Sequence, residues 1–494
     1  MTESNLKKIK PFFSKRKKML SLAIGLILFL FCLLINPFNL LLKANLVLSI
    51  AILMISWWIL DAMPMAAVAL LPIVLFPLFN ISSIKEVTKS YSDSIIFLFM
   101  GGFFIGIGVE KWNLHKRIAL GIIRITGTNG NKIILGFIIA TGFLSLWLSN
   151  TATTMMMFPI AASVIHVISK HQSENANIKN FSLVLMLSIA YASNFALGTI
   201  IGTPPNVAYA NYVVEKFNYT LGFADWMLVF TPLTILLLLM LYWVMVKILY
   251  PNHIKHRERG KKFIDNSYKE LGSISTPEIR VLIVFSCVVV CWIFKDLINH
   301  WQKFIELDDT IIAMAGALAM FIIPSGRKTE DEERLLHWHD TKNMAWGILL
   351  LFGGGLALAK ALEEVKIMDQ LGRLIAAYST DNVFIMMLAV TALSVFLSEV
   401  MSNVAQVIVM APVISSVALA LHMDPLLLGI PMTLGASCAS MLPMGTPPNA
   451  IVFASGHIKM KEMIKAGFAM NIIAIILITL FCYFLQPLIM QLSP

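Results

Sequence analysis

Charged side chains are scarce in this chain of 494 residues. Asp, Glu, Lys and Arg make up 13% of it and apolar residues 58%, whereas a soluble globular protein carries about a quarter charged residues. Apolar runs close to the ~20 residues that cross a bilayer as a helix recur along the whole length. The short alternating segments typical of a transmembrane barrel are missing. The sequence therefore predicts an all-α polytopic membrane protein.

Cysteine and the usual catalytic motifs are also rare. The five cysteines all lie in apolar segments, without the spacing of a metal site, and we interpret them as small apolar residues. The apolar segments contain neither a nucleophile with its base nor an H-E-x-x-H metal motif. These features argue against a membrane-embedded enzyme, and we expect a secondary transporter without an organic cofactor.

Positive charge is concentrated in two blocks. The net charge of +10 comes largely from residues 1–18 and 253–262, and both blocks flank apolar runs. The positive-inside rule explains them better than nucleic-acid binding does, so we expect the N-terminus and residues 251–277 in the cytoplasm, in contact with membrane lipid. The apolar run from Met19 to Leu42 is too long for a signal peptide and predicts a retained helix.

Two apolar segments, 131–168 and 383–421, are too long for a single crossing and carry polar residues at their middle. Treating both as re-entrant hairpins gives about eleven crossings and places both basic blocks on one side, with the C-terminus extracellular. Non-helical backbone inside a membrane is tolerated only where protein or a water-filled cavity surrounds it. We therefore expect the two hairpin tips to face an interior site.

The chain contains an internal repeat. The segment "LFMGGFFIGIGVEKW" at 98–112 matches "LFGGGLALAKALEEV" at 351–365, and the two polar tips match at the same offset of 253 residues. "IGTPPN" at 201–206 answers "MGTPPN" at 444–449, at an offset of 243. Ordered matches of this kind indicate a duplication. An odd number of crossings separates the copies, so they should have inverted topology, which is typical of secondary transporters.

The "GTPPN" motifs predict two unwound stretches, Gly202–Asn206 and Gly445–Asn449, because proline removes a backbone donor and disfavours helix before it. Helix N-termini freed there suit carboxylates, and free carbonyls suit sodium. The only Asp, Glu, Lys or Arg residues in the two hairpins are Lys132 and Glu399. An anion bound between the tips would therefore need dipoles and co-bound cations to offset its desolvation.

Several residues carry open or less specific interpretations. Glu399 is either part of a ligand site or a partner for a neighbouring helix. His337 and His339 could bind metal, but a solvated loop is the better interpretation. The glycine runs at 101–108 and 353–355 indicate close helix packing, and Met155–Met157 indicate packing as well.

The paired "SNT"-type tips and paired "GTPPN" loops resemble the divalent anion/sodium symporter family, which imports di- and tricarboxylates. The resemblance runs from the span at 92 to the end of the chain. It implies a homodimer in which a transport domain moves against a scaffold domain like an elevator. The implied segments are scaffold 1–127, transport domain 128–250 with hairpin 131–168 and unwound helix 181–216, basic loop and scaffold 251–382, and transport domain 383–494 with hairpin 383–421 and unwound helix 424–456.

The resemblance also implies ligands, residue by residue. It places one sodium ion at Ser145, Ser149, Asn150 and the loop at Gly202, and a second at Ser398, Asn403 and the loop at Gly445. It places substrate carboxylates against Asn150, Thr151, Thr203, Ser402, Asn403, Thr446 and Pro447. The second tip departs from the pattern, because Val404 stands where a hydroxyl residue is expected.

The expected function is transport of four- to six-carbon dicarboxylates such as succinate, malate or 2-oxoglutarate across the cell membrane. Sodium-coupled symport is favoured because neither hairpin tip offers a fixed cation. Sodium-independent exchange of dicarboxylates is the main alternative. A cation or metalloid exchanger of similar architecture is a more remote one.

Overall fold

The computed structural model describes residues 3–127, 129–169, 178–219, 221–252, 254, 258–302, 304–327, 333–367, 373 and 382–487. Throughout these residues the regular structure is helical, apart from one isolated bridge between Pro324 and Arg334. Nine of the described helices are long and apolar enough to cross a bilayer, and several shorter apolar helices accompany them. The expectation of an all-α polytopic membrane protein is confirmed.

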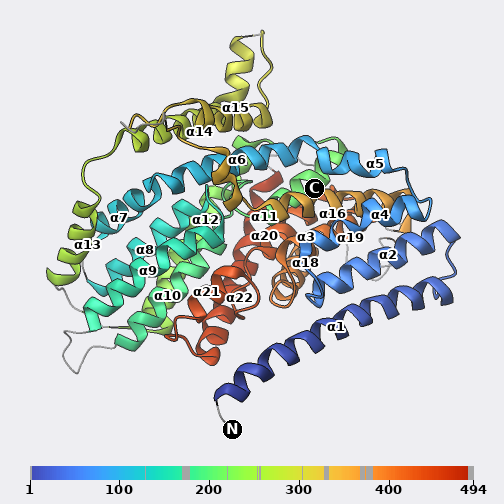
Figure 1. The fold of residues 1–494 in the computed structure, drawn as a ribbon, viewed down its shortest axis with the longest axis horizontal. Helices are drawn as coiled ribbons and strands as arrows, with labels where there is room; N and C mark the ends of the chain where they lie inside the picture. The colour runs from blue at the N-terminus through green and yellow to red at the C-terminus, as the bar shows by residue number, and fades with distance from the viewer. Residues whose placement is uncertain are drawn as a thin grey trace.

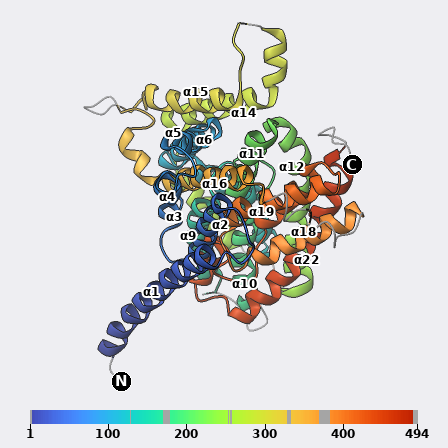
Figure 2. The ribbon, with the colours of Figure 1, turned by 90° about the vertical axis from the view of Figure 1, so that its right-hand side faces the viewer.

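The N-terminal part is a run of helices that ends in a short amphipathic one. The long helix α1 packs along α2 and otherwise projects from the body, as Figures 1 and 2 show. A capping box of Ser83 and Glu86 begins α5. These helices are α1 (Glu3–Ile35), α2 (Leu42–Ile59), α3 (Met65–Val68), α4 (Leu71–Leu78), α5 (Ile84–Lys89), α6 (Ser94–Lys111) and α7 (Leu114–Thr126).

The first copy of the repeat continues from α6 through a helical hairpin, a broken helix and a long helix. Its hairpin is formed by α8 and α9, which pack on α10. A π-helical turn, Val244–Leu249, extends the last helix. The elements are α8 (Gly130–Ser145), α9 (Asn150–Ser169), α10 (Ile178–Asn194), α11 (Pro204–Phe217) and α12 (Phe223–Trp243).

The second copy begins with α16 (Trp346–Glu364) and repeats this order of elements. Its hairpin is formed by α18 and α19, and its broken helix by α20 and α21. The same sequence of elements in both copies is the structural counterpart of the motif matches. The elements after α16 are α18 (Val383–Leu397), α19 (Asn403–Ala420), α20 (Pro425–Ala436), α21 (Pro447–Phe453) and α22 (Met460–Phe484).

Three helices connect the copies: α13 (Glu258–Glu270), α14 (Thr276–Trp301) and α15 (Asp309–Ile322). The amphipathic α13 packs on α7, and α15 packs along α6. Figures 1 and 2 both place α14 and α15 at one edge of the molecule, on the far side of α6 from the two hairpins. The sequence also predicts a short amphipathic segment at 365–378. Most of this segment, and part of the basic block at 253–262, lie outside the described residues.

The glycine runs allow close packing, as expected. A side chain at Gly101 would collide with the backbone of Ala313 on α15, at 2.7 Å, and one at Gly354 would collide with the carbonyl of Ala69 beside α3. Without a Cβ at these two positions, α6 and α16 come close to their neighbours. Both helices therefore lie firmly against the N-terminal and connecting helices.

The position of the two helix breaks differs from the prediction. The non-helical stretches are 195–203 and 437–446, whereas Pro204 and Pro447 already lie in the first turn of α11 and α21. At the first helical position proline loses no intrahelical hydrogen bond, and its fixed φ suits the helix. The expectation that unwinding extends to Asn206 and Asn449 was wrong. The prolines begin the second half-helix, and the unwound backbone precedes them.

Candidate functional site

Each hairpin turns at a short tip whose last residue begins a helix. The first tip lies between Ser145 and Asn150, and the second between Leu397 and Asn403. At the first tip, Ser149 Oγ accepts a hydrogen bond from the N–H of Ala152 at 3.2 Å, which satisfies one of the free donors at the start of α9. Both tips therefore present a helix N-terminus next to polar side chains, as expected for a site that receives an anion.

A serine and an asparagine make the same contact in both tips. Ser145 Oγ lies 2.7 Å from the side-chain amide of Asn150, and Ser398 Oγ lies 2.7 Å from that of Asn403. Each serine hydroxyl also contacts the end of the helix that follows the hairpin. Ser145 donates to the carbonyl of Ser193 at the end of α10, and Ser398 donates to the carbonyl of Ala436 at the end of α20. Ser145 and Ser398 are fully buried. The duplication in sequence is thus a duplication of contacts.

The Asn150 amide faces a cluster of oxygen atoms. One of its terminal atoms lies 2.7 Å from Ser145 Oγ, 3.0 Å from the Gly202 carbonyl and 3.1 Å from the Ser193 carbonyl. The hydrogen bonds are satisfied when that atom is the amide nitrogen, which then donates to all three oxygens. With the amide reversed, its oxygen joins the same three oxygens in a set of four that suits a cation. Three of the residues expected around the first sodium ion are therefore together, while the Ser149 hydroxyl caps α9.

Of the residues expected around the second sodium ion, fewer are in contact with one another. Ser398 and Asn403 are in contact. Gly445 lies beside the carboxylate of Glu399, since a methyl group at Gly445 would be 3.1 Å from Glu399 Oε2. No hydrogen bond joins Gly445 to either tip residue within the described part of the chain.

The two broken helices are joined by an exchanged pair of hydrogen bonds at their breaks. Asn194 Nδ2 donates to Thr446 Oγ1 at 3.1 Å, and Ser437 Oγ donates to Thr203 Oγ1 at 3.1 Å. Asn194 corresponds to Ser437 and Thr203 to Thr446 at the offset of 243. In each copy the first of these positions donates to the other copy and the second accepts from it, which is the pattern of a two-fold interface. Two expected substrate residues, Thr203 and Thr446, meet the opposite copy here.

Within each copy the asparagine of "GTPPN" ties the unwound stretch to its half-helix. Asn206 Nδ2 donates to the carbonyl of Thr199 at 3.1 Å, and Asn449 Nδ2 donates to that of Leu442 at 3.1 Å. These two bonds occupy equivalent positions in the copies. Both asparagines are fully buried, so their part is to fix the loop.

Glu399 is a partner of the second unwound stretch. Its carboxylate accepts from the backbone N–H groups of Ser440, Met441 and Leu442, at 2.8, 2.8 and 2.9 Å. It also accepts from Asn471 Nδ2 at 2.7 Å. Hydrogen bonds to an ionised acceptor are the strong kind, and this side chain is only 3% exposed. Of the two interpretations left open for Glu399, the structure supports the packing partner.

The other expected substrate residues differ in their availability. Thr151, Ser402 and Asn403 are half-buried, as is Asn150, whereas Thr203 and Thr446 are buried and Pro447 is exposed. The Thr203 and Thr446 hydroxyls accept hydrogen bonds from the opposite copy, and each still carries a hydrogen that it can donate to an anion. The half-buried tip residues are the ones that a ligand can reach directly.

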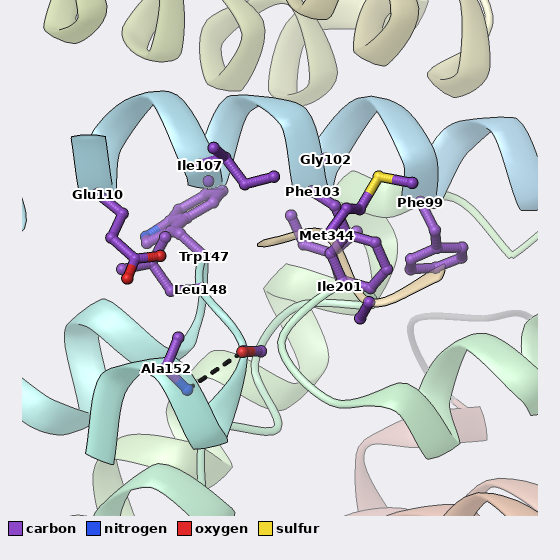
Figure 3. A pocket seen from close by; sticks show the side chains of 13 residues that line it. Phe99, Gly102, Phe103, Ile107, Glu110, Trp147, Leu148, Ala152, Ile201 and Met344 are labelled. Carbon is purple, nitrogen blue, oxygen red and sulfur yellow. Dashed lines mark hydrogen bonds between the residues drawn. The ribbon is translucent and has the colours of Figure 1, made fainter. Parts of the chain in front are cut away.

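A cavity of about 80 Å³ lies beside the first tip. Figure 3 shows it between α6 and the hairpin turn, with Glu110 and Phe103 on one side and Trp147, Leu148 and Ala152 on the other. The α6 residues were not among the expected site residues. The repeated "GG" segment was the available signal, because Gly102 and Gly106 leave the space that the cavity occupies.

The histidines of "HWHD" do not form a metal site. His339 Nε2 contacts Lys342 Nζ at 2.8 Å, and the backbone N–H of His337 donates to Asp340. In the part of the chain that the structure describes, no group of three or more His, Cys, Asp or Glu residues could hold a metal ion.

Comparison with known proteins gives one consistent assignment. The model of a family described as the sodium:sulfate symporter transmembrane region matches residues 15–491. The sodium-dependent dicarboxylate transporter SdcS of Staphylococcus saprophyticus is 39% identical over 491 residues, covering 96% of this chain and 94% of that protein. SdcS of Staphylococcus aureus strain USA300 is 38% identical over 499 residues, covering 98% and 96%.

Two solved structures resemble the fold at low sequence identity. MtrF of Neisseria gonorrhoeae has a TM-score of 0.56 at 12% identity, covering 81% of this chain and 83% of that one. The YdaH transporter of Alcanivorax borkumensis has a TM-score of 0.52 at 11% identity, covering 81% and 87%. These similarities concern the fold alone.

Proposed function

This chain belongs to the sodium:sulfate symporter transmembrane family, and we propose that it carries dicarboxylates across the cell membrane together with sodium ions. The relatives are named as sodium-dependent dicarboxylate transporters, and this chain matches them over nearly their whole length. The chain is accordingly a membrane transporter. The observation that supports sodium coupling is the convergence of three oxygens, from Ser145, Ser193 and Gly202, on the Asn150 amide.

The sodium ions bind at the two serine–asparagine contacts. At the first, the Asn150 amide, the Ser145 hydroxyl and the carbonyls of Gly202 and Ser193 lie within reach of one point. Hydroxyl, amide and carbonyl oxygens are the hard ligands that a small cation prefers. The second ion binds at Ser398 and Asn403, with Gly445 carrying the adjoining backbone.

The dicarboxylate binds between the two tips. The N-termini of α9 and α19 supply backbone donors, and Asn150, Thr151, Ser402 and Asn403 supply half-buried side-chain donors. Neither hairpin carries an arginine or lysine near its tip, so the sodium ions offset part of the substrate's negative charge. Four- to six-carbon dicarboxylates such as succinate, malate and 2-oxoglutarate carry two carboxylates, one for the donors of each tip.

Transport follows an elevator movement in a homodimer. The two hairpins and broken helices form the moving transport domain, within 128–250 and 383–494, and the remaining helices form the scaffold. The exchanged hydrogen bonds between Asn194, Thr446, Ser437 and Thr203 support movement of both halves as one body. The N-terminus lies in the cytoplasm and the C-terminus outside, in agreement with the basic blocks.

Uptake of labelled succinate into proteoliposomes tests this function. We expect an inward sodium gradient alone to drive accumulation, with no requirement for internal dicarboxylate. Uptake that needs internal dicarboxylate and ignores sodium would establish exchange instead. No uptake of any four- to six-carbon dicarboxylate under either condition would refute dicarboxylate transport.

A further inference from the structure

Two ion pairs join the ends of α11 and α16. Lys216 on α11 pairs with Glu363 on α16, and Glu215 on α11 pairs with Lys360 on α16. The four side chains are between 21% and 48% exposed. In the proposed function α11 belongs to the moving domain and α16 to the scaffold. These pairs therefore connect two parts that must separate during a transport cycle.

The internal repeat duplicates one of these pairs and not the other. Glu363 corresponds to Glu110 on α6 at the offset of 253, and Lys216 corresponds to Lys459 at the offset of 243. The partners of the second pair have no charged equivalents, because Lys360 corresponds to Ile107 and Glu215 to Ile458. The sequence thus keeps an acid and a base at matching positions in both copies.

The duplicated pair is not formed in this structure. Glu110 lines the cavity beside the first tip, and Figure 3 shows its side chain extending from α6 towards the hairpin. Lys459 is exposed and is the N-cap residue of α22, six residues after α21 ends at Phe453. Its backbone N–H donates to Glu462, and its side chain extends from this turn. Among the described residues neither side chain has an ion-pair partner within 4 Å.

The helices around the two pairs are also packed unequally: α16 packs tightly beside the formed pairs, and α6 packs loosely beside the pair that is not formed. On the side of the formed pairs, α16 lies so close to α19 that a side chain at Gly355 would be 2.7 Å from Ile408. The equivalent glycine on α6, Gly102, has its nearest side chain, that of Ile201, at 3.9 Å. Met155, the equivalent of Ile408, was expected to pack, yet it is 62% exposed. One copy is closed against the scaffold, and the other is open.

We propose that Lys216–Glu363 and Lys459–Glu110 are alternating ion pairs, each formed in one of the two opposite-facing states. This proposal rests on the proposed transport function. In a protein built from inverted copies, the opposite-facing state is reached when the copies exchange their conformations. In that state α21 approaches α6 as α11 approaches α16 here, and Lys459 reaches Glu110 on the loop that follows Phe453. The cavity beside the first tip then closes, and Lys216 separates from Glu363.

The strength of such pairs suits this role. Partly exposed ion pairs contribute little net stability, because solvent screens them and ordering long side chains costs entropy. A pair of this kind can therefore close one side without trapping the carrier. Exchanging one pair for another of equal chemistry also keeps the two states close in free energy, so bound sodium and substrate can shift the balance.

Paired cysteines test the alternation. In a background with the five native cysteines replaced, we would introduce Lys216→Cys with Glu363→Cys, or Glu110→Cys with Lys459→Cys. Each variant in proteoliposomes would be treated with a short bismaleimide, and the cross-linked peptides identified by mass spectrometry. We expect both pairs to cross-link within one protomer, and sodium with succinate to change the two yields in opposite directions. Glu110→Cys with Lys216→Cys is the matched control and should not cross-link.

Charge exchange gives a second measurement. Glu110→Lys should lower the initial rate of uptake about tenfold or more, a loss of roughly 1.4 kcal/mol, and adding Lys459→Glu should restore most of it. Absence of the 110–459 cross-link under all conditions, yields that change in the same direction, or failure of the second substitution to rescue the first would overturn the proposal. Cross-linking needs no transported label, so opposite changes in yield without net succinate uptake would contradict only the transport function.

Discussion

The two copies of the repeat share their tip contacts but hold their unwound stretches by different means. In the first copy the Thr199 hydroxyl donates to the carbonyl of Leu146 at 2.5 Å, a neutral contact. In the second copy Glu399, at the position equivalent to Leu146, uses its carboxylate to bind three consecutive backbone N–H groups. The same local fold is thus fixed once without charge and once with a buried negative charge.

The difference shows which features the duplication must keep and which can diverge. The serine–asparagine contacts and the exchanged bonds between the copies are the same in both halves, so they serve something that both halves do. The anchoring of the loop behind the tip can change as long as the backbone keeps its shape. The loss of a hydroxyl at Val404, which is buried, is a second divergence.

The largest effect should come from removing either tip amide. Asn150→Ala and Asn403→Ala should each reduce sodium-driven uptake by about 100-fold or more, a loss of roughly 2.7 kcal/mol, because each deletes a proposed ligand of both sodium and substrate. Uptake in proteoliposomes measures the loss, with the amount of folded protein checked by size-exclusion chromatography. Near-normal uptake by either variant would remove that asparagine from the site.

Asn150→Asp sharpens this comparison. A carboxylate among the Gly202 and Ser193 carbonyls is tolerated if a cation lies there, and it is repelled if the amide nitrogen donates to them. We expect uptake to persist with a lower sodium concentration at half-maximal rate. A loss as complete as that in Asn150→Ala would show that the amide acts as a donor and that sodium binds elsewhere.

The second largest effect should be on stability. Glu399→Ala leaves three backbone donors and Asn471 without their acceptor, and should lower the free energy of unfolding by roughly 3 to 5 kcal/mol. Thr199→Val removes a single neutral hydrogen bond and should cost about 1 kcal/mol. Unfolding of both variants in detergent would test the contrast between the two anchors. Equal losses would mean that the charged anchor is no stronger than the neutral one.

A smaller effect should distinguish the two glycines that face the tips. Gly355→Ala places a methyl group 2.7 Å from Ile408, and overpacking of this kind costs about 1 to 3 kcal/mol. Gly102→Ala meets nothing closer than 3.9 Å and is its matched control. The free energy of unfolding measured in detergent should fall by about 1 to 3 kcal/mol for Gly355→Ala and by about 0.5 kcal/mol or less for Gly102→Ala. The reverse order would mean that the side near α6 is the more tightly closed one.

The smallest effect should come from restoring symmetry at the second tip. Val404→Thr gives the tip the hydroxyl that Thr151 supplies in the first copy. Because the position is only 9% exposed, we expect the KM for succinate to change by about threefold or less, within the ~1 kcal/mol net value of a hydrogen bond. A larger decrease in KM would show that Val404 limits how tightly the substrate is held.

The tips and the repeat could be predicted closely from the sequence because they are local signals. The serine–asparagine pairs interrupt long apolar runs. The bounds expected for the two interrupted segments, 131–168 and 383–421, therefore agree with those of the helix pairs α8–α9 and α18–α19 to within about two residues. The helix breaks were misplaced because proline disrupts a helix interior but starts one well, and the sequence does not say which of these positions it occupies.

The remaining features depend on contacts between distant segments. The partners of Glu399 come from residues 440–442 and from Asn471, roughly forty to seventy positions away, so no local pattern distinguished a packing partner from a ligand. The cavity beside Glu110 exists only because α6 and the first tip meet. The exchanged bonds between Asn194, Thr446, Ser437 and Thr203 likewise required the two copies to be placed together.

Those exchanged bonds also bear on how the protein is made. Asn194 leaves the ribosome some 250 residues before Thr446 does, which at about 5 to 20 residues per second is a delay of roughly 12 to 50 seconds. Throughout that interval the earlier half has polar groups at its centre whose final partners do not yet exist. Maturation of this carrier therefore includes a waiting period, during which water, lipid headgroups or the insertion machinery must satisfy an unfinished interior.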